Sequence, residues 1–207
     1  MKTGILLAVL LSTAPAVFVY CGSMDQGQDI PFAGLFYDQM RFQTLFTKTQ
    51  LGISGSITQI AFRVHPSIEG PGLYHNGRIT LCHTDLNALT EYFNSNYDGF
   101  TPVDTLTGAE IFIPDLADSW VTLDFATPFN YSTSHNLIVE LRWFQDNGND
   151  VPVWAWDPAS GNRRVYASAM EATVGNADHY AYYMRFIIGG EAVEPNSLGM
   201  MKASFAK

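Results

Sequence analysis

Two tryptophans, Trp154 and Trp156, have the type and spacing that most directly indicate a binding chemistry. They are two residues apart, so on a β-strand both side chains project from one face, where aromatic rings can stack on the apolar face of a sugar. Pro152 favours an edge strand for this segment. The alternative is that the tryptophans point into the core, because Trp is highly buried on average. Residues that could add hydrogen bonds to a ligand are Tyr183, Arg142 and Arg63.

A second set of residues could mediate assembly. The N-terminal segment ahead of the first predicted strand is polar but contains the apolar side chains of Ile30, Phe32, Leu35, Phe36 and Tyr37. Such a segment either folds onto its own domain or pairs with the open edge of a neighbouring subunit, where it satisfies backbone groups that the edge leaves bare. A head-to-tail contact of the second kind does not close on itself and produces filaments.

Catalytic and metal-binding motifs are absent from the sequence. It contains no Gly-x-Ser-x-Gly, no His-Glu-x-x-His, no phosphate-binding loop and no Cys pair at metal spacing, so we predict no enzymatic activity, no cofactor and no metal site. The oxygen-rich segment 146–150 could bind calcium, but it lacks the glycine and the distal glutamate of a calcium loop and fits a hairpin turn. His83 shares a strand face with apolar residues, which favours a half-buried structural role over ligation.

The composition disfavours some classes of partner. The 207 residues include 20 acidic side chains against 11 Lys and Arg, a formal net charge of −9. We therefore expect no basic surface that could displace counterions from nucleic acid or dock on an anionic membrane. The expected partners are proteins, including further copies of this chain, with glycans as the alternative. Of the two cysteines, Cys82 lies in a strand pattern and is typical of a small buried apolar residue.

The N-terminus has the pattern of a secretory signal peptide, because Lys2 precedes a long apolar run. The alternative is a membrane anchor, which an internal proline and the lack of a basic flank disfavour. Two cleavage points stay open, after Ala14-Pro15-Ala16 or near Gly22, and we assign residues 1–23 to the signal peptide. The mature protein is thus expected outside the cytoplasm, secreted or at the cell surface, without a membrane span.

Short segments of alternating polarity recur along the rest of the chain, separated by turns rich in Gly, Pro and Asn. In 137–143, apolar residues occupy one face while Glu140 and Arg142 occupy the other, which is typical of a half-buried strand. We place 120–125 and 137–143 at the centre of the fold. The strands predicted on this basis are 41–51, 57–66, 78–84, 103–113, 120–125, 137–143, 151–157, 163–170 and 179–188.

Two connections are predicted from their composition. Residues 67–77 form a Gly- and Pro-rich loop that ends in the turn dipeptide Asn76-Gly77. Residues 85–102 form a long irregular loop in which Asp85 could cap one or two helical turns. Its embedded aromatic residues could plug one end of the core, although long loops in compact domains are often functional.

These patterns predict an all-β protein, a single antiparallel β-sandwich that is jelly-roll-like and spans residues 41–190. An N-terminal segment, 24–40, precedes it, and a flexible tail, 191–207, follows.

Several stretches resemble a group of uncharacterised jelly-roll-like β-sandwich modules of secreted bacterial proteins; they are 51–62, 79–84, 120–123, 127–131 and 136–140. The resemblance covers about residues 43–188 and implies the fold and an extracellular setting, but it says little about activity. Modules of this group usually sit in longer chains beside peptidases, adhesion modules or sorting tails. Here no catalytic domain is attached, the tail is short for a sorting domain, and no functional residue can be carried over.

The sequence therefore leads us to expect a non-catalytic structural or adhesive protein, secreted or at the cell surface, that acts through protein–protein contacts and could self-assemble. A carbohydrate-binding module is the alternative, and an extracellular hydrolase is the weakest hypothesis for want of a motif. The single domain favours the first, because a sugar-binding module normally delivers a linked catalytic domain.

Overall fold

Antiparallel β-strands account for most of the regular structure of this chain. The computed structural model describes residues 16–145 and 149–189. Its strands are β1 Val17–Cys21, β2 Gln26–Gln28, β3 Gln39–Phe46, β4 Gly55–Arg63, β5 Gly72–Thr84, β6 Val103–Ile113, β7 Trp120–Tyr131, β8 Asn136–Phe144, β9 Val153–Trp156, β10 Arg164–Ala167, β11 Asn176–Asp178, β12 Ala181–Tyr182 and β13 Met184–Gly189. The helical segments are α1 Lys48–Leu51 and the 3₁₀ turn η1 Phe93–Tyr97.

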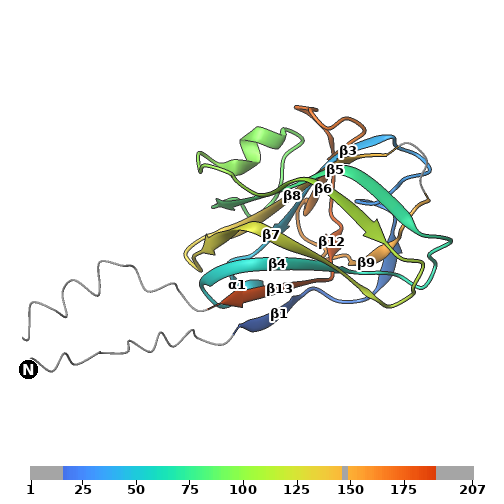
Figure 1. Cartoon of the computed structure of the whole chain (residues 1–207). Helices are drawn as coiled ribbons and strands as arrows, with labels where there is room; N and C mark the ends of the chain where they lie inside the picture. Colours follow the sequence, from blue (N-terminus) through green and yellow to red (C-terminus); the bar gives the residue numbers. More distant parts are fainter. Residues whose placement is uncertain (1–15, 146–148, 190–207) are drawn as a thin grey trace, which may run out of the picture.

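The strands form two main layers that face each other (Figure 1). One layer is a four-stranded sheet in the order β1-β13-β4-β7, and the other is a six-stranded sheet in the order β11-β10-β3-β8-β5-β6. A small third sheet, β12-β9-β2, lies at one side. Aromatic and aliphatic side chains from both layers, such as Phe62, Trp143 and Phe186, fill the space between the layers as one core. The predicted all-β sandwich is therefore confirmed.

The order in which the strands pair is that of a jelly roll. β5 pairs with β6, β4 with β7, β3 with β8 and β2 with β9, every pair antiparallel, as in one long hairpin that is wrapped around a core. The outermost pair contacts the residue that follows β4 through an isolated bridge between Val64 and Val153. β1 and β13 extend this framework and pair along the whole of β1.

The two strands predicted at the centre of the fold lie in different layers. β7 pairs with β4, and β8 pairs with β3 and β5. β7 also continues through Pro128 to Tyr131, beyond the predicted end of this strand at residue 125. The predicted alternation of β7 is confirmed, because Val121 and Leu123 are buried whereas Thr122 and Asp124 are exposed.

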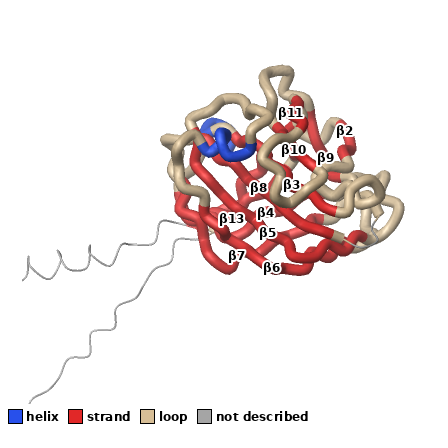
Figure 2. The backbone as a smooth tube through the Cα atoms, turned by 90° about the horizontal axis from the view of Figure 1, so that it is seen from above, coloured by secondary structure: helices blue, strands red, loops and turns tan. Residues whose placement is uncertain are grey.

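The prediction that β8 is half-buried was wrong. Glu140 has no exposed surface and Arg142 has 8%, although both lie on the face opposite the core. Segments from elsewhere in the chain cover this outer face, and Leu89, Phe93 and Tyr97 pack there against Ile138 and Val165. In Figure 2 the strands form most of the described backbone, and the helical turns lie to one side of it.

The predicted strand 41–51 ends earlier than expected, at Phe46. The next residues form α1, which begins with a capping box. The side chain of Thr47 accepts a hydrogen bond from the backbone of Gln50, and the side chain of Gln50 accepts one from the backbone of Thr47. Gly52 ends the helix in the left-handed conformation with φ of 67°.

The predicted turn at Asn76-Gly77 was also wrong, because β5 runs through both residues. The pairing of β5 with β6 shifts register on either side of Gly77, and Asn76 has a φ of 50°. Asparagine and glycine tolerate the local backbone of a β-bulge as readily as that of a turn. Asn76 and Arg78 in this part of β5 line the pocket described below.

The long irregular loop 85–102 is confirmed, but its predicted details differ. Its helical turn is η1, well after Asp85, and the Asp85 carboxylate contacts His135 Nδ1 at 2.7 Å instead of capping a helix. Tyr97 is buried over the outer face of the six-stranded sheet rather than plugging an end of the sandwich.

The segments near the C-terminal end are also divided more finely than predicted. β9 has neighbours on both sides, β12 and β2, so it is not an edge strand despite Pro152. The predicted strand 179–188 breaks at Tyr183, since β12 pairs with β9 whereas β13 pairs with β1 and β4. The predicted tail 191–207 and most of the predicted signal peptide lie outside the described residues.

Candidate functional site

An aromatic and cationic patch covers one end of the outer face of the four-stranded sheet. We call it the aromatic face; its residues are Phe18, Tyr20, Arg63, Trp120, Tyr183 and Arg185. The strand register brings them together, because Tyr20 on β1 is paired with Arg185 on β13, and Arg63 on β4 is paired with Trp120 on β7. Alternation along each strand directs these side chains away from the core.

Three rings of the aromatic face contact one another. The ring centroids of Trp120 and Tyr183 are 5.5 Å apart, those of Tyr20 and Trp120 are 5.8 Å apart, and those of Tyr20 and Tyr183 are 6.4 Å apart. Tyr20 and Phe18 are about half exposed, at 52% and 53%. The cluster therefore presents apolar ring surface to solvent while its members hold one another in place.

The guanidinium of Arg185 lies across this cluster. Its Cζ atom is 4.8 Å from the ring centroid of Trp120 and 5.3 Å from that of Phe18, and its Nη2 atom donates a hydrogen bond to Thr122 Oγ1 at 3.2 Å. No carboxylate among the described residues lies at ion-pair distance from Arg185, and its buried Nε atom has no hydrogen-bond partner there. Within the described ranges, the positive charge of Arg185 is thus not balanced by an ion pair.

Arg63 contributes a second, weakly paired cation. Its Cζ atom is 5.4 Å from the Trp120 ring centroid, and its Nε atom is 3.8 Å from Asp118 Oδ1, too far for a hydrogen bond. The aromatic face therefore offers Tyr, Trp and Arg side chains, the types that dominate binding energy at protein interfaces, and guanidinium donors that suit a carboxylate.

The structure places the predicted pair Trp154 and Trp156 beside this face. Val153 and Ala155 point into the core, so both tryptophans project outward from β9 and are partly exposed. Trp154 Nε1 donates to Asp118 Oδ1 at 3.1 Å, which links it to Arg63 through one carboxylate. Its ring also meets that of His65, with centroids 4.3 Å apart.

Of the three hydrogen-bonding residues predicted with these tryptophans, Tyr183 and Arg63 belong to the aromatic face. Arg142 does not, because it lies on the outer side of the other sheet. The residues that the sequence analysis missed are Phe18, Tyr20, Trp120 and Arg185. The first two were assigned to the signal peptide, although Phe18 and Tyr20 alternate with Val19 and Cys21 as in a strand.

Arg142 instead belongs to a buried polar network around Glu140. Oε2 of Glu140 accepts hydrogen bonds from Arg41 Nη2 at 2.9 Å, Gln43 Nε2 at 2.6 Å and the Tyr97 hydroxyl at 2.8 Å, and Oε1 accepts one from Arg142 Nε at 2.7 Å. Burial, followed by the Glu140 carboxylate, raises the pKa of Tyr97 and keeps this phenol protonated. Both carboxylate oxygens of Glu140 accept hydrogen bonds, and the bond from Tyr97 links the long loop to the six-stranded sheet.

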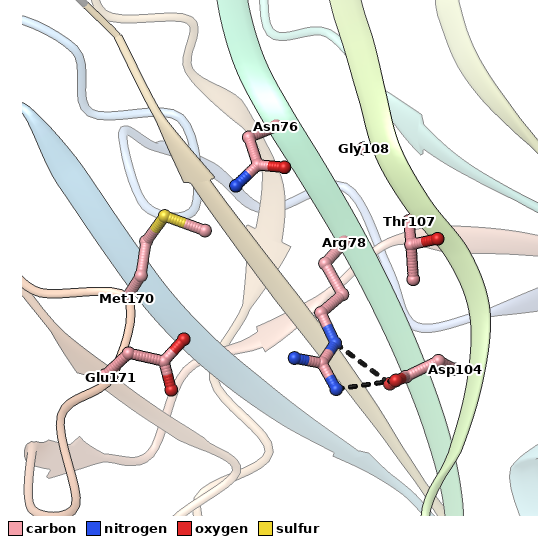
Figure 3. Close-up of a pocket in the computed structure, with 7 residues that line it drawn as sticks. All are labelled: Asn76, Arg78, Asp104, Thr107, Gly108, Met170 and Glu171. Carbon is pink, nitrogen blue, oxygen red and sulfur yellow. Dashed lines mark hydrogen bonds and ion pairs between the residues drawn. The ribbon is translucent and has the colours of Figure 1, made fainter.

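A pocket of about 380 Å³ lies next to this network, between β5, β6 and the loop that carries Met170 and Glu171 (Figure 3). Arg78 on β5 donates two hydrogen bonds to Asp104 on β6, so these two charged side chains of the pocket already form an ion pair with each other. Figure 3 shows Glu171 and Met170 on the opposite side of the pocket. A ligand that bound to either of these two charges would have to compete with their ion pair.

His83 matches its predicted structural role. Its Nε2 atom accepts a hydrogen bond from the Ser132 backbone at 3.0 Å, and burial followed by repulsion from His135 lowers its pKa. No group of three or more His, Cys, Asp or Glu side chains in the described ranges is arranged to hold a metal ion. The predicted hairpin turn at 146–150, with its calcium alternative, falls partly on residues 146–148, which lie outside the described residues.

The predicted assembly segment is divided between core and surface. Phe32 has no exposed surface and Ile30 has 8%, and the backbone oxygen of Pro31 accepts a hydrogen bond from Trp143 Nε1. Leu35 and Phe36, in contrast, are 64% and 71% exposed. The first part of the segment thus docks on its own domain, and only the tip at Leu35 and Phe36, with half-buried Tyr37 beside it, stays open to a partner.

The chain matches no family model, and no curated protein is significantly similar to it.

Proposed function

We propose that this chain is a non-catalytic structural or adhesive protein that acts through protein–protein contacts at its aromatic face. The observation that carries the proposal is the cluster of Tyr20, Trp120 and Tyr183 with two arginines, neither of which has a tight carboxylate partner among the described residues. Such a surface gains from burial of its rings and from a carboxylate that satisfies the guanidinium donors. The partner should therefore carry an apolar projection next to acidic groups.

A second copy of the chain has this chemistry. Leu35 and Phe36 project from the surface beside a pocket lined by Asp29, Glu69 and Asp150, and we call these five residues the acidic tip. Burial raises the pKa of Asp150, and repulsion from Asp29 and Glu69 raises it further, although the Leu35 backbone N–H opposes the shift. The acidic tip thus has an excess of negative charge, and the aromatic face has an excess of positive charge.

Docking of the acidic tip on the aromatic face of the next copy would bury apolar side chains and pair opposite charges. The two surfaces share no residue, so the contact is head-to-tail and can propagate. This arrangement keeps the self-assembly expected from the sequence, but it uses a surface contact in place of strand exchange, because Phe32 is in its own core.

Sedimentation of the protein over a range of concentrations tests this function. We expect the wild type to form species larger than a monomer and Tyr20→Ser to weaken the association at least about ten-fold, as loss of a central aromatic contact does. Tyr92→Ser is the matched control, because Tyr92 is 51% exposed, as Tyr20 is, but lies on the long loop. A wild type that stays monomeric at millimolar concentration would rule out self-assembly through this face.

Glycan binding is the second candidate function. The observation that favours it is the near-parallel pair of Tyr20 and Tyr183, whose ring planes differ by 22°. Against it, two guanidinium groups lie over the ring of Trp120, where a sugar would stack. Titration with a panel of polysaccharides, followed by Trp fluorescence, separates the two: saturable quenching that Tyr20→Ser abolishes would favour the glycan function.

The proposal places the protein outside the cytoplasm, secreted or at the cell surface, as the N-terminal sequence predicts. None of the helices in the described part of the chain has the length and hydropathy that a membrane crossing requires. The resemblance to β-sandwich modules of secreted bacterial proteins agrees with this setting and stays a prediction.

A further inference from the structure

β1 is an integral part of the sandwich. All five of its residues pair with β13, from Val17 opposite Ile188 to Cys21 opposite Met184. Cys21 is 1% exposed within the core, and Val19 packs against the same core. On its other side, β1 supplies two residues of the aromatic face. The folded domain therefore uses the chain from Val17 onward, within the range that the sequence alone assigned to a signal peptide.

The residues ahead of β1 contain, in order, the parts of a complete secretory signal. Lys2 provides the positive start, residues 4–11 form an apolar run, and Ala14-Pro15-Ala16 is a small-x-small site of the kind that a signal peptidase recognises. The apolar run falls within the range of about 7–15 residues for such signals. Ala16 is exposed and directly precedes the strand.

We propose that a signal peptidase hydrolyses the peptide bond between Ala16 and Val17. Water adds across this bond, which leaves a carboxylate on Ala16 and a new α-amino group on Val17, the first residue of β1. The proposal rests on the extracytoplasmic location proposed above. Cleavage near Gly22 would instead remove β1, leave one edge of β13 unpaired and take Phe18 and Tyr20 from the aromatic face.

The position of β1 in the sandwich also buries the thiol of Cys21. Its Sγ atom is buried and contacts the backbone oxygen of Gln50 at 3.5 Å, and burial raises the pKa of the thiol to about 12. Cleavage at the proposed bond therefore keeps Cys21 in the mature chain, where it is a free cysteine buried in the core.

The test is the N-terminus of the exported protein, produced from the full chain in a host with secretory machinery and measured by intact mass and N-terminal sequencing. We expect the mature chain to begin at Val17 and Ala16→Arg to abolish this cleavage. Ser23→Arg is the matched control, because Ser23 is exposed beside the alternative cleavage point, and the mature N-terminus should stay at Val17.

The outcomes separate the cleavage site from the location. A mature N-terminus at Gly22 or beyond would overturn the proposed cleavage site and leave export intact. Full-length, unprocessed chain in the cytoplasm would overturn both the cleavage site and the extracytoplasmic location.

Discussion

Arg41 and Arg185 both stack on aromatic rings, but only Arg41 has a carboxylate partner among the described residues, so we expect different roles for them. Arg41 lies 4.4 Å from the ring centroid of Phe93 and is neutralised by the buried Glu140. Arg185 lies on Trp120 and has no carboxylate within ion-pair distance among the described residues. A closed network fixes the fold, whereas an unpaired cation on exposed rings is available to a partner. This contrast leads us to assign binding to Arg185 rather than to the more buried arginines.

The first prediction concerns the closed network. Glu140→Gln should lower the free energy of unfolding by about 3–5 kcal/mol, because it leaves Arg41 buried without its counter-charge and removes the buried carboxylate partner of Arg142. Glu171→Gln is the control: Glu171 also pairs with Arg142, but it is 81% exposed, and its loss should cost at most about 1 kcal/mol. Denaturant unfolding measures both, and equal losses would contradict a structural role for Glu140.

The second prediction concerns His83, whose pKa is lowered in the folded chain. The unfolded chain therefore takes up a proton at a higher pH than the folded chain does, so His83 costs stability as the pH falls below the ordinary value of about 6.5. His83→Gln removes this titration while keeping an acceptor for the Ser132 backbone N–H. Unfolding free energies at mildly acidic and neutral pH should differ less in this variant than in the wild type, and an unchanged difference would count against the assignment.

At the scale of elements, alternation along the chain was enough to predict strands but not their surroundings. The predicted strand 103–113 has the bounds of β6, because alternating residues on an outer strand report its exposure directly. β8 shows the same alternation, but its polar face is covered by a loop that is distant in the sequence and buries Glu140. The local pattern of residues in β8 cannot indicate that burial. Asn76-Gly77 was mistaken for a turn because the same backbone preferences serve a bulge.

The candidate site was only partly predictable for a related reason. Tyr183 and Arg63 could be proposed as binding residues from their outward positions on strands. Phe18 and Tyr20 lie in an apolar run that continues the signal-like sequence, so their strand character was hidden until their pairing with β13 was known. Arg185 became a candidate binding residue only because its guanidinium lies over the rings of Phe18 and Trp120, which belong to other strands.

The third prediction tests the placement of β1. Cys21→Asp should destabilise the fold by more than about 3 kcal/mol, because it places a carboxylate in the core, whereas Tyr20→Asp should have a small effect on stability. The two positions are adjacent on one strand but face opposite sides, so they act as matched controls for each other. Similar denaturation midpoints for the two variants would mean that β1 is not part of the folded sheet.

At the scale of the whole molecule, charge is distributed unevenly. The net charge of −9 makes general contact between copies unfavourable, so association requires local complementarity. In the proposed contact, the aromatic face and the acidic tip provide this complementarity, because they carry opposite charges and both expose aromatic rings. Because they are different surfaces of one molecule, removing either surface should stop growth while leaving the other surface able to bind.

Mixing two variants tests this central claim most directly. The face variant carries Tyr20→Ser with Arg185→Glu, and the tip variant carries Leu35→Ser with Phe36→Ser; light scattering with size-exclusion chromatography gives the mass of each alone and of the equimolar mixture. We predict that each variant alone is monomeric and that the mixture forms dimers that grow no further, since one intact face meets one intact tip. A mixture that stays monomeric, or a single variant that still assembles as the wild type does, would contradict the head-to-tail contact.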